Sequence, residues 1–172
     1  NQEWERVFDL YKNTPEYSFY NKGMLLSEFK FIFFWEYFHR LWGRIIGIVF
    51  IIPFIYFLVT KKIDKFITVR LLVILFFGSL QAFIGWWMVK SGLIDKPDVS
   101  QYRLAIHFGN SLLILFLLFW LILDLKYKKS RIKFDLNLII FFIIFVTIIA
   151  GSLVAGMDAG LMYNTYPLMN DS

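Results

Sequence analysis

Histidine occurs only twice in this chain, and both residues fall within hydrophobic segments that are long enough to cross a membrane. His39 lies in the segment Phe31–Val59, and His107 lies in the segment Gln101–Leu123. An ionisable side chain at membrane depth is costly, so it usually serves a function. Because a neutral imidazole nitrogen is a common metal ligand, two such residues on separate spans suggest the axial ligands of one haem iron.

The two histidines are predicted to lie at similar depths in the membrane. Both spans are expected to start on the outer side, with His39 eight residues after Phe31 and His107 six residues after Gln101. At about 1.5 Å per residue, these positions are roughly 12 and 9 Å below the outer ends of the helices. The alternative is two unrelated histidines, each hydrogen-bonded in a bundle core. The matched depth favours a ligand clamped between the two rings.

Charged residues accompany both histidines. Glu36 comes one turn before His39, Arg40 one turn after Glu36, and Arg103 one turn before His107. Haem carries two propionates, and a guanidinium pairs well with carboxylates, so Arg40 and Arg103 are candidate cofactor-binding residues. An ion pair with Glu36 is the alternative role of Arg40. Glu36 is the candidate catalytic residue, because a carboxylate beside a haem ligand can accept a proton.

Small residues follow each histidine on its own face. Gly43 and Gly47 come one and two turns after His39, and Asn110 comes one turn after His107. Gly43 is therefore a candidate cofactor-binding position, where the missing side chain leaves a groove for a flat ligand. Close helix packing is the alternative, since Gly-x-x-x-Gly steps commonly serve it in membranes.

Hydropathy predicts the elements that position these residues. The chain is 59% hydrophobic and 21% aromatic, and a span needs about 20 mostly apolar residues. Four segments qualify, which predicts an all-α polytopic membrane protein with four transmembrane helices: Phe31–Val59, Leu71–Val89, Tyr102–Leu123 and Leu136–Ala155. The absence of cysteine excludes disulfides, thiolate-bound metals and cysteine catalysis within this chain.

Basic residues cluster in the two loops after the first and third segments. Such clusters next to spans mark cytoplasmic loops rather than nucleic-acid sites, so residues 1–30 are predicted to face outside. The cluster residues are Lys61, Lys62, Lys65, Arg70, Lys126, Lys128, Lys129, Arg131 and Lys133.

Four motifs resemble the haem A synthase family in its cysteine-free proteobacterial and mitochondrial form. Residues 28–44 resemble E-F-K-x-I-F-x-x-E-x-x-H-R-x-x-G-R, and residues 99–107 resemble V-S-x-Y-R-L-A-x-H. Residues 81–93 resemble Q-G-x-x-G-W-W-M-V-x-S-G-L, with Ala82 at the usual first glycine. Residues 154–167 resemble V-A-G-L-D-A-G followed by Y-N-T-F-P, with Met157 and Tyr166 as mild departures.

The resemblance implies a partial chain. The family has eight spans in a pseudo-symmetric pair of four-helix bundles, and this chain resembles spans two to five. Residues 1–30 would form a periplasmic-side loop segment, and residues 31–135 three helices of the N-terminal haem-binding half. Residues 136–172 would hold the first helix of the second half and the following outer loop. A haem b is expected in the half that is missing here.

The resemblance further implies oxidation of a methyl group of haem O to a formyl group, by successive hydroxylations, for cytochrome oxidase assembly. His39 and His107 would hold the substrate iron, and Glu36 would assist proton movement or stabilise a cationic intermediate. Expected partners are haem O and haem A, a haem O synthase, an electron donor and, as an open alternative, a second copy of the chain. The expected location is the bacterial inner membrane, or the mitochondrial inner membrane in a eukaryote.

Two other functions stay open at this point. A membrane cytochrome b that only transfers electrons explains the two histidines equally well, but it explains Glu36 and the outer-loop motifs poorly. A non-haem protein such as a transporter half, with polar residues lining a path, would leave the matched histidine depth as chance.

Overall fold

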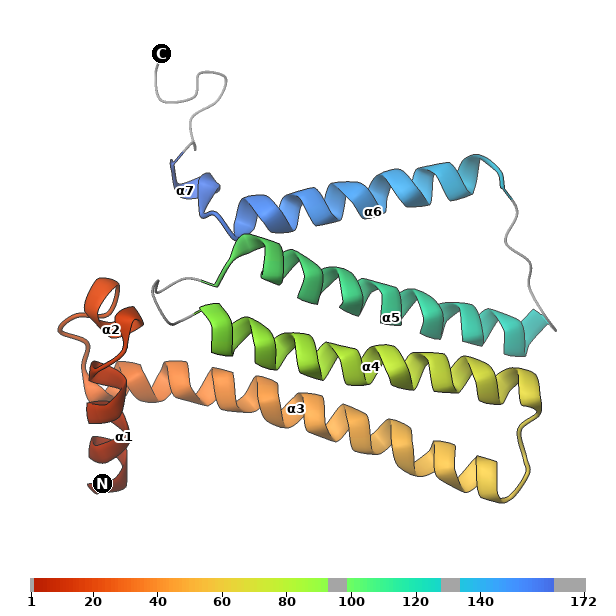
Figure 1. Ribbon diagram of the computed structural model, residues 1–172, viewed down its shortest axis with the longest axis horizontal. Helices are drawn as coiled ribbons and strands as arrows, with labels where there is room; N and C mark the ends of the chain where they lie inside the picture. The colour runs from red at the N-terminus through yellow and green to blue at the C-terminus, as the bar shows by residue number, and fades with distance from the viewer. Residues whose placement is uncertain (1, 93–98, 128–133, 163–172) are drawn as a thin grey trace, which may run out of the picture. The chain divides into compact units, whose positions relative to one another are not determined.

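The computed structural model describes residues 2–92, 99–127 and 134–162, and within these ranges it is all-α (Figure 1). Helices α3 to α6 are each long and apolar enough to cross a membrane, which confirms the predicted all-α fold with four spans. The helices are α1 (Gln2–Lys12), α2 (Pro15–Phe19), α3 (Leu26–Val59), α4 (Lys65–Gly92), α5 (Gln101–Tyr127), α6 (Leu136–Ala155) and α7 (Ala159–Met162).

Carboxylates at the helix starts explain why two spans begin earlier than hydropathy predicts. In the first turn of α3, Oε2 of Glu28 accepts a hydrogen bond from the backbone N–H of Leu25 at 2.8 Å, so the helix already begins at Leu26. Before α4, Oδ1 of Asp64 accepts from the backbone N–H of Ile67 at 2.8 Å. Each bond satisfies an amide near a helix start, and a hydropathy window does not detect it.

Helix α6 has the bounds that the sequence predicts, because a capping carboxylate and the start of the apolar run coincide there. Asp135 is the N-cap, and its Oδ1 accepts from the backbone N–H of Leu138 at 3.2 Å, just where the apolar run begins. Helix α5 instead continues to Tyr127, past the predicted end at residue 123. Residues 128–133, with four of the predicted basic cluster residues, and residues 163–167 of the last motif lie outside the described ranges.

Large apolar side chains are exposed along α3 to α6. Ile52 on α3 is 63% exposed, and Phe142 on α6 is 64% exposed. Apolar surface on this scale is unfavourable in water but is what lipid-facing helices present. The chain is therefore a multi-pass membrane protein.

The described residues divide into two compact units. Unit 1 holds α1, α2, α3 and residues 65–75 and 89–92 of α4. Unit 2 holds residues 76–88 of α4 together with α5, α6 and α7. Predicted site residues occur in both units.

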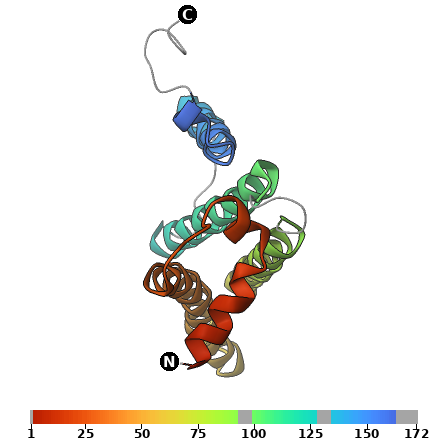
Figure 2. The same cartoon turned by 90° about the vertical axis from the view of Figure 1, so that its left-hand side faces the viewer.

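In unit 1, the first two helices form an aromatic cap at the start of α3. Helix α1 crosses the first turns of α3 (Figures 1 and 2), where the rings of Phe8 and Phe29 stack at 5.0 Å and both side chains are buried. The ring of Trp4 meets Phe33 edge-on at 5.2 Å. Residues 1–30, predicted only as a loop segment, therefore contain helices that pack on the first span.

In unit 2, α5 and α6 run antiparallel and side by side (Figure 1). At the C-cap of α6, Gly156 lies against the backbone of Gln101, since a Cβ at Gly156 would lie 2.9 Å from the Gln101 Cα. Farther along, the rings of Phe116 and Phe141 pack at 5.2 Å. This packing fixes the part of α5 that carries His107.

Candidate functional site

In unit 1, four predicted site residues occupy neighbouring turns of α3. Glu36, His39, Arg40 and Gly43 are all exposed. Nη1 of Arg40 donates to Oε2 of Glu36 at 3.3 Å, so the ion pair that the sequence offers as an alternative role is present. Glu36 keeps 54% of its side chain exposed and Arg40 keeps 49%, so this bond leaves both groups accessible to a further ligand.

Gly43 and Gly47 leave the space beside this part of α3 open. A Cβ added at either glycine would meet no atom within 4 Å. The close helix packing that Gly-x-x-x-Gly steps often serve is therefore not made at these two positions among the described residues. The groove proposed for a flat ligand is compatible with this open surface.

The aromatic cap contains a second carboxylate, Glu16, whose pKa is affected by the charge of Glu36. Burial raises the pKa of Glu16, a hydrogen bond from the Tyr11 hydroxyl lowers it, and the charge of Glu36 raises it further. Burial also raises the pKa of the Tyr11 hydroxyl, to which Nδ2 of Asn21 donates at 2.7 Å. The cap thus places titratable groups close enough to Glu36 to interact electrostatically.

In unit 2, the ring of His107 is held by a polar group on the neighbouring helix. Nε2 of Gln81 on α4 lies 3.2 Å from Nε2 of His107 on α5. Nδ2 of Asn110 donates to Oε1 of Gln81 at 2.7 Å and to the backbone carbonyl of Phe77 at 3.1 Å. Asn110 is buried, so these bonds satisfy an amide that would otherwise be costly inside the helix pair.

The absence of a side chain at Gly85 leaves room for the His107 ring. A Cβ at Gly85 would lie 3.0 Å from Cε1 of His107, closer than side-chain carbons normally approach. The missing side chain therefore lets the imidazole lie directly against the backbone of α4. Gly85 lies one turn after Gln81, so the same helix face supplies both the room for the ring and the hydrogen bond.

Arg103 lies one turn before His107, as the sequence predicts, and contacts Trp87. The centre of its guanidinium lies 5.2 Å from the centroid of the Trp87 ring. A cation over an indole face keeps its N–H donors available at its edge. Arg103 therefore remains suited to binding a carboxylate.

The predicted site residues form two groups, one in each unit. Glu36, His39, Arg40 and Gly43 belong to unit 1, and Arg103 and His107 belong to unit 2. The predicted pairing of His39 with His107 stays a prediction. Among the described residues, no three His, Asp or Glu side chains gather as a protein-only metal centre would require.

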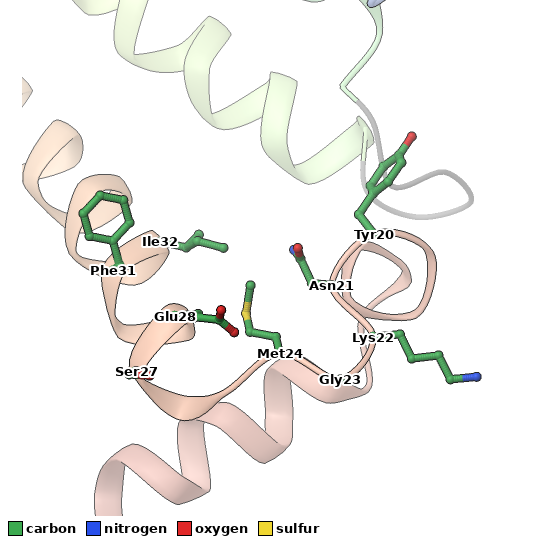
Figure 3. Close-up of a pocket in the computed structure, with 9 residues that line it drawn as sticks. All are labelled: Tyr20, Asn21, Lys22, Gly23, Met24, Ser27, Glu28, Phe31 and Ile32. Carbon is green, nitrogen blue, oxygen red and sulfur yellow. The ribbon is translucent and has the colours of Figure 1, made fainter.

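An open pocket of about 660 Å³ lies where the cap joins α3, apart from the predicted residues. Figure 3 shows Asn21, Met24, Glu28 and Ile32 around its centre, with Lys22 directed away. Its lining contains none of the residues predicted for haem binding. The pocket is therefore a feature of the cap and does not define the candidate site.

Sequence reasoning about chemistry missed the role of Gln81. The residue enters the motif over residues 81–93 only as a letter, and Asn110 enters only as a small neighbour of His107. The available signal was polarity, because an amide within a span usually hydrogen-bonds across helices. The partner could not be identified without the register between α4 and α5.

Comparison with known proteins agrees with the motifs. The profile of a family described as cytochrome oxidase assembly protein matches residues 1–172. The haem A synthase of Parvibaculum lavamentivorans is 46% identical over 98% of this chain and 50% of its own length. Those of Nitrosospira multiformis and Flavobacterium psychrophilum are 46% and 47% identical over 98% of this chain, and over 49% and 52% of their own lengths.

The chain thus spans about half the length of the curated relatives it matches. No solved structure matches it. The family profile nevertheless covers every residue from 1 to 172, including those that supply the His107 site and the α3 group. The chain belongs to the cytochrome oxidase assembly protein family.

Proposed function

We propose that this chain forms the N-terminal haem-binding part of a haem A synthase, which oxidises a methyl group of haem O to a formyl group. The motifs and the names of the relatives support this activity. The structural observation that carries it is the His107 site. There an imidazole lies against Gly85, with its Nε2 3.2 Å from the amide nitrogen of Gln81.

The donor set at His107 fits an iron porphyrin. A metal-binding histidine must be neutral, with an unprotonated nitrogen to offer. Nε2 of His107 faces an amide N–H donor and therefore carries a lone pair. Iron in the bound porphyrin supplies the oxidative chemistry, and the protein supplies binding, orientation and electrostatics.

Each predicted residue has a defined role in this proposal. His39 and His107 hold the iron of haem O, and Arg40 and Arg103 pair with its propionates. Gly43 leaves room for the flat ring on α3. Glu36 accepts or holds a proton close to His39, a role for which its exposed carboxylate is available.

The proposal extends to the wider setting of the protein, with support from the family resemblance. The membrane is the bacterial inner membrane, with residues 1–30 on the periplasmic side, or the mitochondrial inner membrane in a eukaryote. The complete protein holds a haem b in the half that this chain lacks. It takes haem O from a haem O synthase, receives electrons from a donor protein and delivers haem A for cytochrome oxidase assembly.

Pigment extraction from the full-length protein tests this activity. Haem A, or haem O with an oxidised methyl group, is the expected product after expression with haem O. Haem B alone would favour the electron-transferring cytochrome b, and a preparation without haem would favour a transporter. A His107→Phe variant should lose the product, whereas Ser79→Ala on α4 should retain it.

A further inference from the structure

A backbone carbonyl fixes the orientation of the amides that lead to His107. The carbonyl oxygen of Phe77 can only accept a hydrogen bond, so the atom of Asn110 that lies 3.1 Å away must be its nitrogen. The same nitrogen lies 2.7 Å from the end of the Gln81 side chain. That end must therefore be the Gln81 oxygen.

The orientation of Gln81 in turn fixes the proton on His107. With its oxygen toward Asn110, Gln81 directs its NH₂ group to Nε2 of His107 at 3.2 Å. A ring nitrogen that receives an N–H donor cannot itself carry a proton. The proton of the neutral ring is then on Nδ1, and the lone pair is on Nε2.

We infer that Gln81 and Asn110 are positioning residues that hold His107 in the Nδ1-protonated tautomer and reserve the Nε2 lone pair for iron. This inference rests on the proposed function only in its last step, the replacement of Gln81 by iron. Nε2 has one lone pair, so it can accept from Gln81 or bind iron, but not both. Iron binding therefore releases the Gln81 amide.

The residues around His107 favour one position of its ring, in which Gln81 can donate to Nε2. Gly85 allows the ring to lie against α4, within reach of Gln81 one turn earlier. Asn110 is 9% exposed and bonds to both Gln81 and the Phe77 carbonyl, so its amide has little freedom to reverse. The series of hydrogen bonds runs from the Phe77 carbonyl on α4 through Asn110 and Gln81 to His107 on α5.

Nitrogen NMR of ¹⁵N-histidine in the haem-free full-length protein tests the tautomer, with the His107 signals assigned by their loss in His107→Phe. The expected spectrum has a protonated Nδ1 and an unprotonated Nε2. Gln81→Leu removes the donor at similar volume, and Asn110→Leu removes the orienting amide. Both should change one tautomer into a mixture, whereas Thr147→Val on α6, whose hydroxyl bonds to the Ile143 carbonyl, should not.

Three results would overturn the assignment. They are a wild-type His107 protonated at Nε2, an unchanged tautomer in Gln81→Leu, and a change in Gln81→Leu without one in Asn110→Leu. The last of these would show that the Phe77 carbonyl does not determine the orientation of the Gln81 amide. If Asn110→Leu does not fold, Gln81→Leu still decides the role of the glutamine.

Iron protoporphyrin and iron-free protoporphyrin test the last step. The iron compound should shift or broaden the His107 ring signals, and the iron-free compound should leave Nε2 bonded to Gln81. An iron porphyrin that binds without affecting His107 would overturn the replacement of Gln81 and the ligand role of His107. The tautomer result would stand, so failure of the proposed function can be told from failure of the positioning role.

Discussion

A single substitution can separate the role proposed for Glu36, a proton carrier near His39, from its role as the partner of Arg40 in an ion pair. If the ion pair only holds α3 in place, its loss should lower protein yield and bound haem together. Proton transfer by a positioned side chain contributes roughly 10²–10⁴-fold to a rate. The two roles therefore predict different results for loss of the carboxylate.

In the full-length protein, Glu36→Gln should keep the protein yield and bound haem while lowering haem A formation by about 10²-fold or more. His39→Ala should instead change the absorption spectrum that reports iron ligation. Glu5→Gln, at an exposed position on α1, is the control for loss of a carboxylate. Normal haem A formation in Glu36→Gln would rule out the catalytic role, and a joint fall in yield and haem would favour the ion pair.

Glu16 should make the aromatic cap sensitive to pH. Burial and the charge of Glu36 raise the pKa of Glu16 in the folded cap, despite the bond from Tyr11. The folded state therefore holds the proton more tightly than the unfolded state, so this stabilisation is complete below the ordinary glutamate pKa and is lost as pH rises through the raised value. The cap should loosen on moving from about pH 4 to neutral pH.

Hydrogen exchange of residues 2–20, corrected for its intrinsic pH dependence, measures this loosening. Protection should fall with rising pH in the wild type and stay level in Glu16→Gln. Glu5→Gln on α1 should behave as the wild type. Equal pH dependence in Glu16→Gln and the wild type would show that another group controls the cap.

Residue types were easier to predict than residue partners. Histidines and arginines within apolar segments stand out in a sequence, and the i to i+4 spacing correctly indicated the Glu36–Arg40 pair on one helix. The bond from Gln81 to His107 joins two helices and depends on their register. A one-residue shift of α4 would replace Gln81 with a different side chain, and a single sequence does not determine that shift.

At the scale of the elements, hydropathy located all four spans but only some of their ends. Helix α6 was predicted with its observed bounds because its N-cap residue, Asp135, directly precedes the apolar run. The starts of α3 and α4 contain polar residues whose stabilising bonds come from Glu28 and Asp64. Helices α1 and α2 were not predicted, because short helices outside the membrane lack the long apolar run used to find the spans.

Gly156 should be the most sensitive glycine of the α5–α6 pair. A Cβ there would lie 2.9 Å from the Cα of Gln101, and a backbone atom cannot turn aside as a side chain can. Gly156→Ala should therefore destabilise unit 2 by about 1–3 kcal/mol. Its φ of −73° suits alanine, so the cost comes from packing.

Gly151→Ala is the control, because Gly151 lies on α6 and a Cβ there would meet no neighbouring atom within 4 Å. It should be neutral or stabilise by up to about 1 kcal/mol through helix propensity. Thermal loss of the helical circular dichroism signal compares the two variants. Equal midpoints would show that α5 and α6 are not closely packed at Gln101.

At the scale of the whole molecule, the two units divide the predicted haem ligands between them. Unit 1 contains His39 with the catalytic candidate Glu36, and unit 2 contains His107 with its positioning residues. The chain also covers about half the length of its relatives. The proposed activity therefore belongs to the complete protein.

The orientation of the whole chain in the membrane is the remaining prediction. Lys61, Lys62 and Lys65 lie in or directly after the short turn between α3 and α4, and Arg70 follows in the first turns of α4. Lysine and arginine in short loops are retained on the cytoplasmic side, so this turn should be inside and the aromatic cap outside. Because the chain has no native cysteine, single cysteines can report each side.

In sealed cells expressing a full-length protein without other cysteines, an impermeant maleimide should label Glu5→Cys in the cap and leave Lys62→Cys unlabelled. Permeabilised cells should label both, which shows that each cysteine is reactive. Labelling of Lys62→Cys alone in sealed cells would reverse the orientation. Labelling of both in sealed cells would be incompatible with α3 crossing the membrane, because positions 5 and 62 lie on either side of that helix.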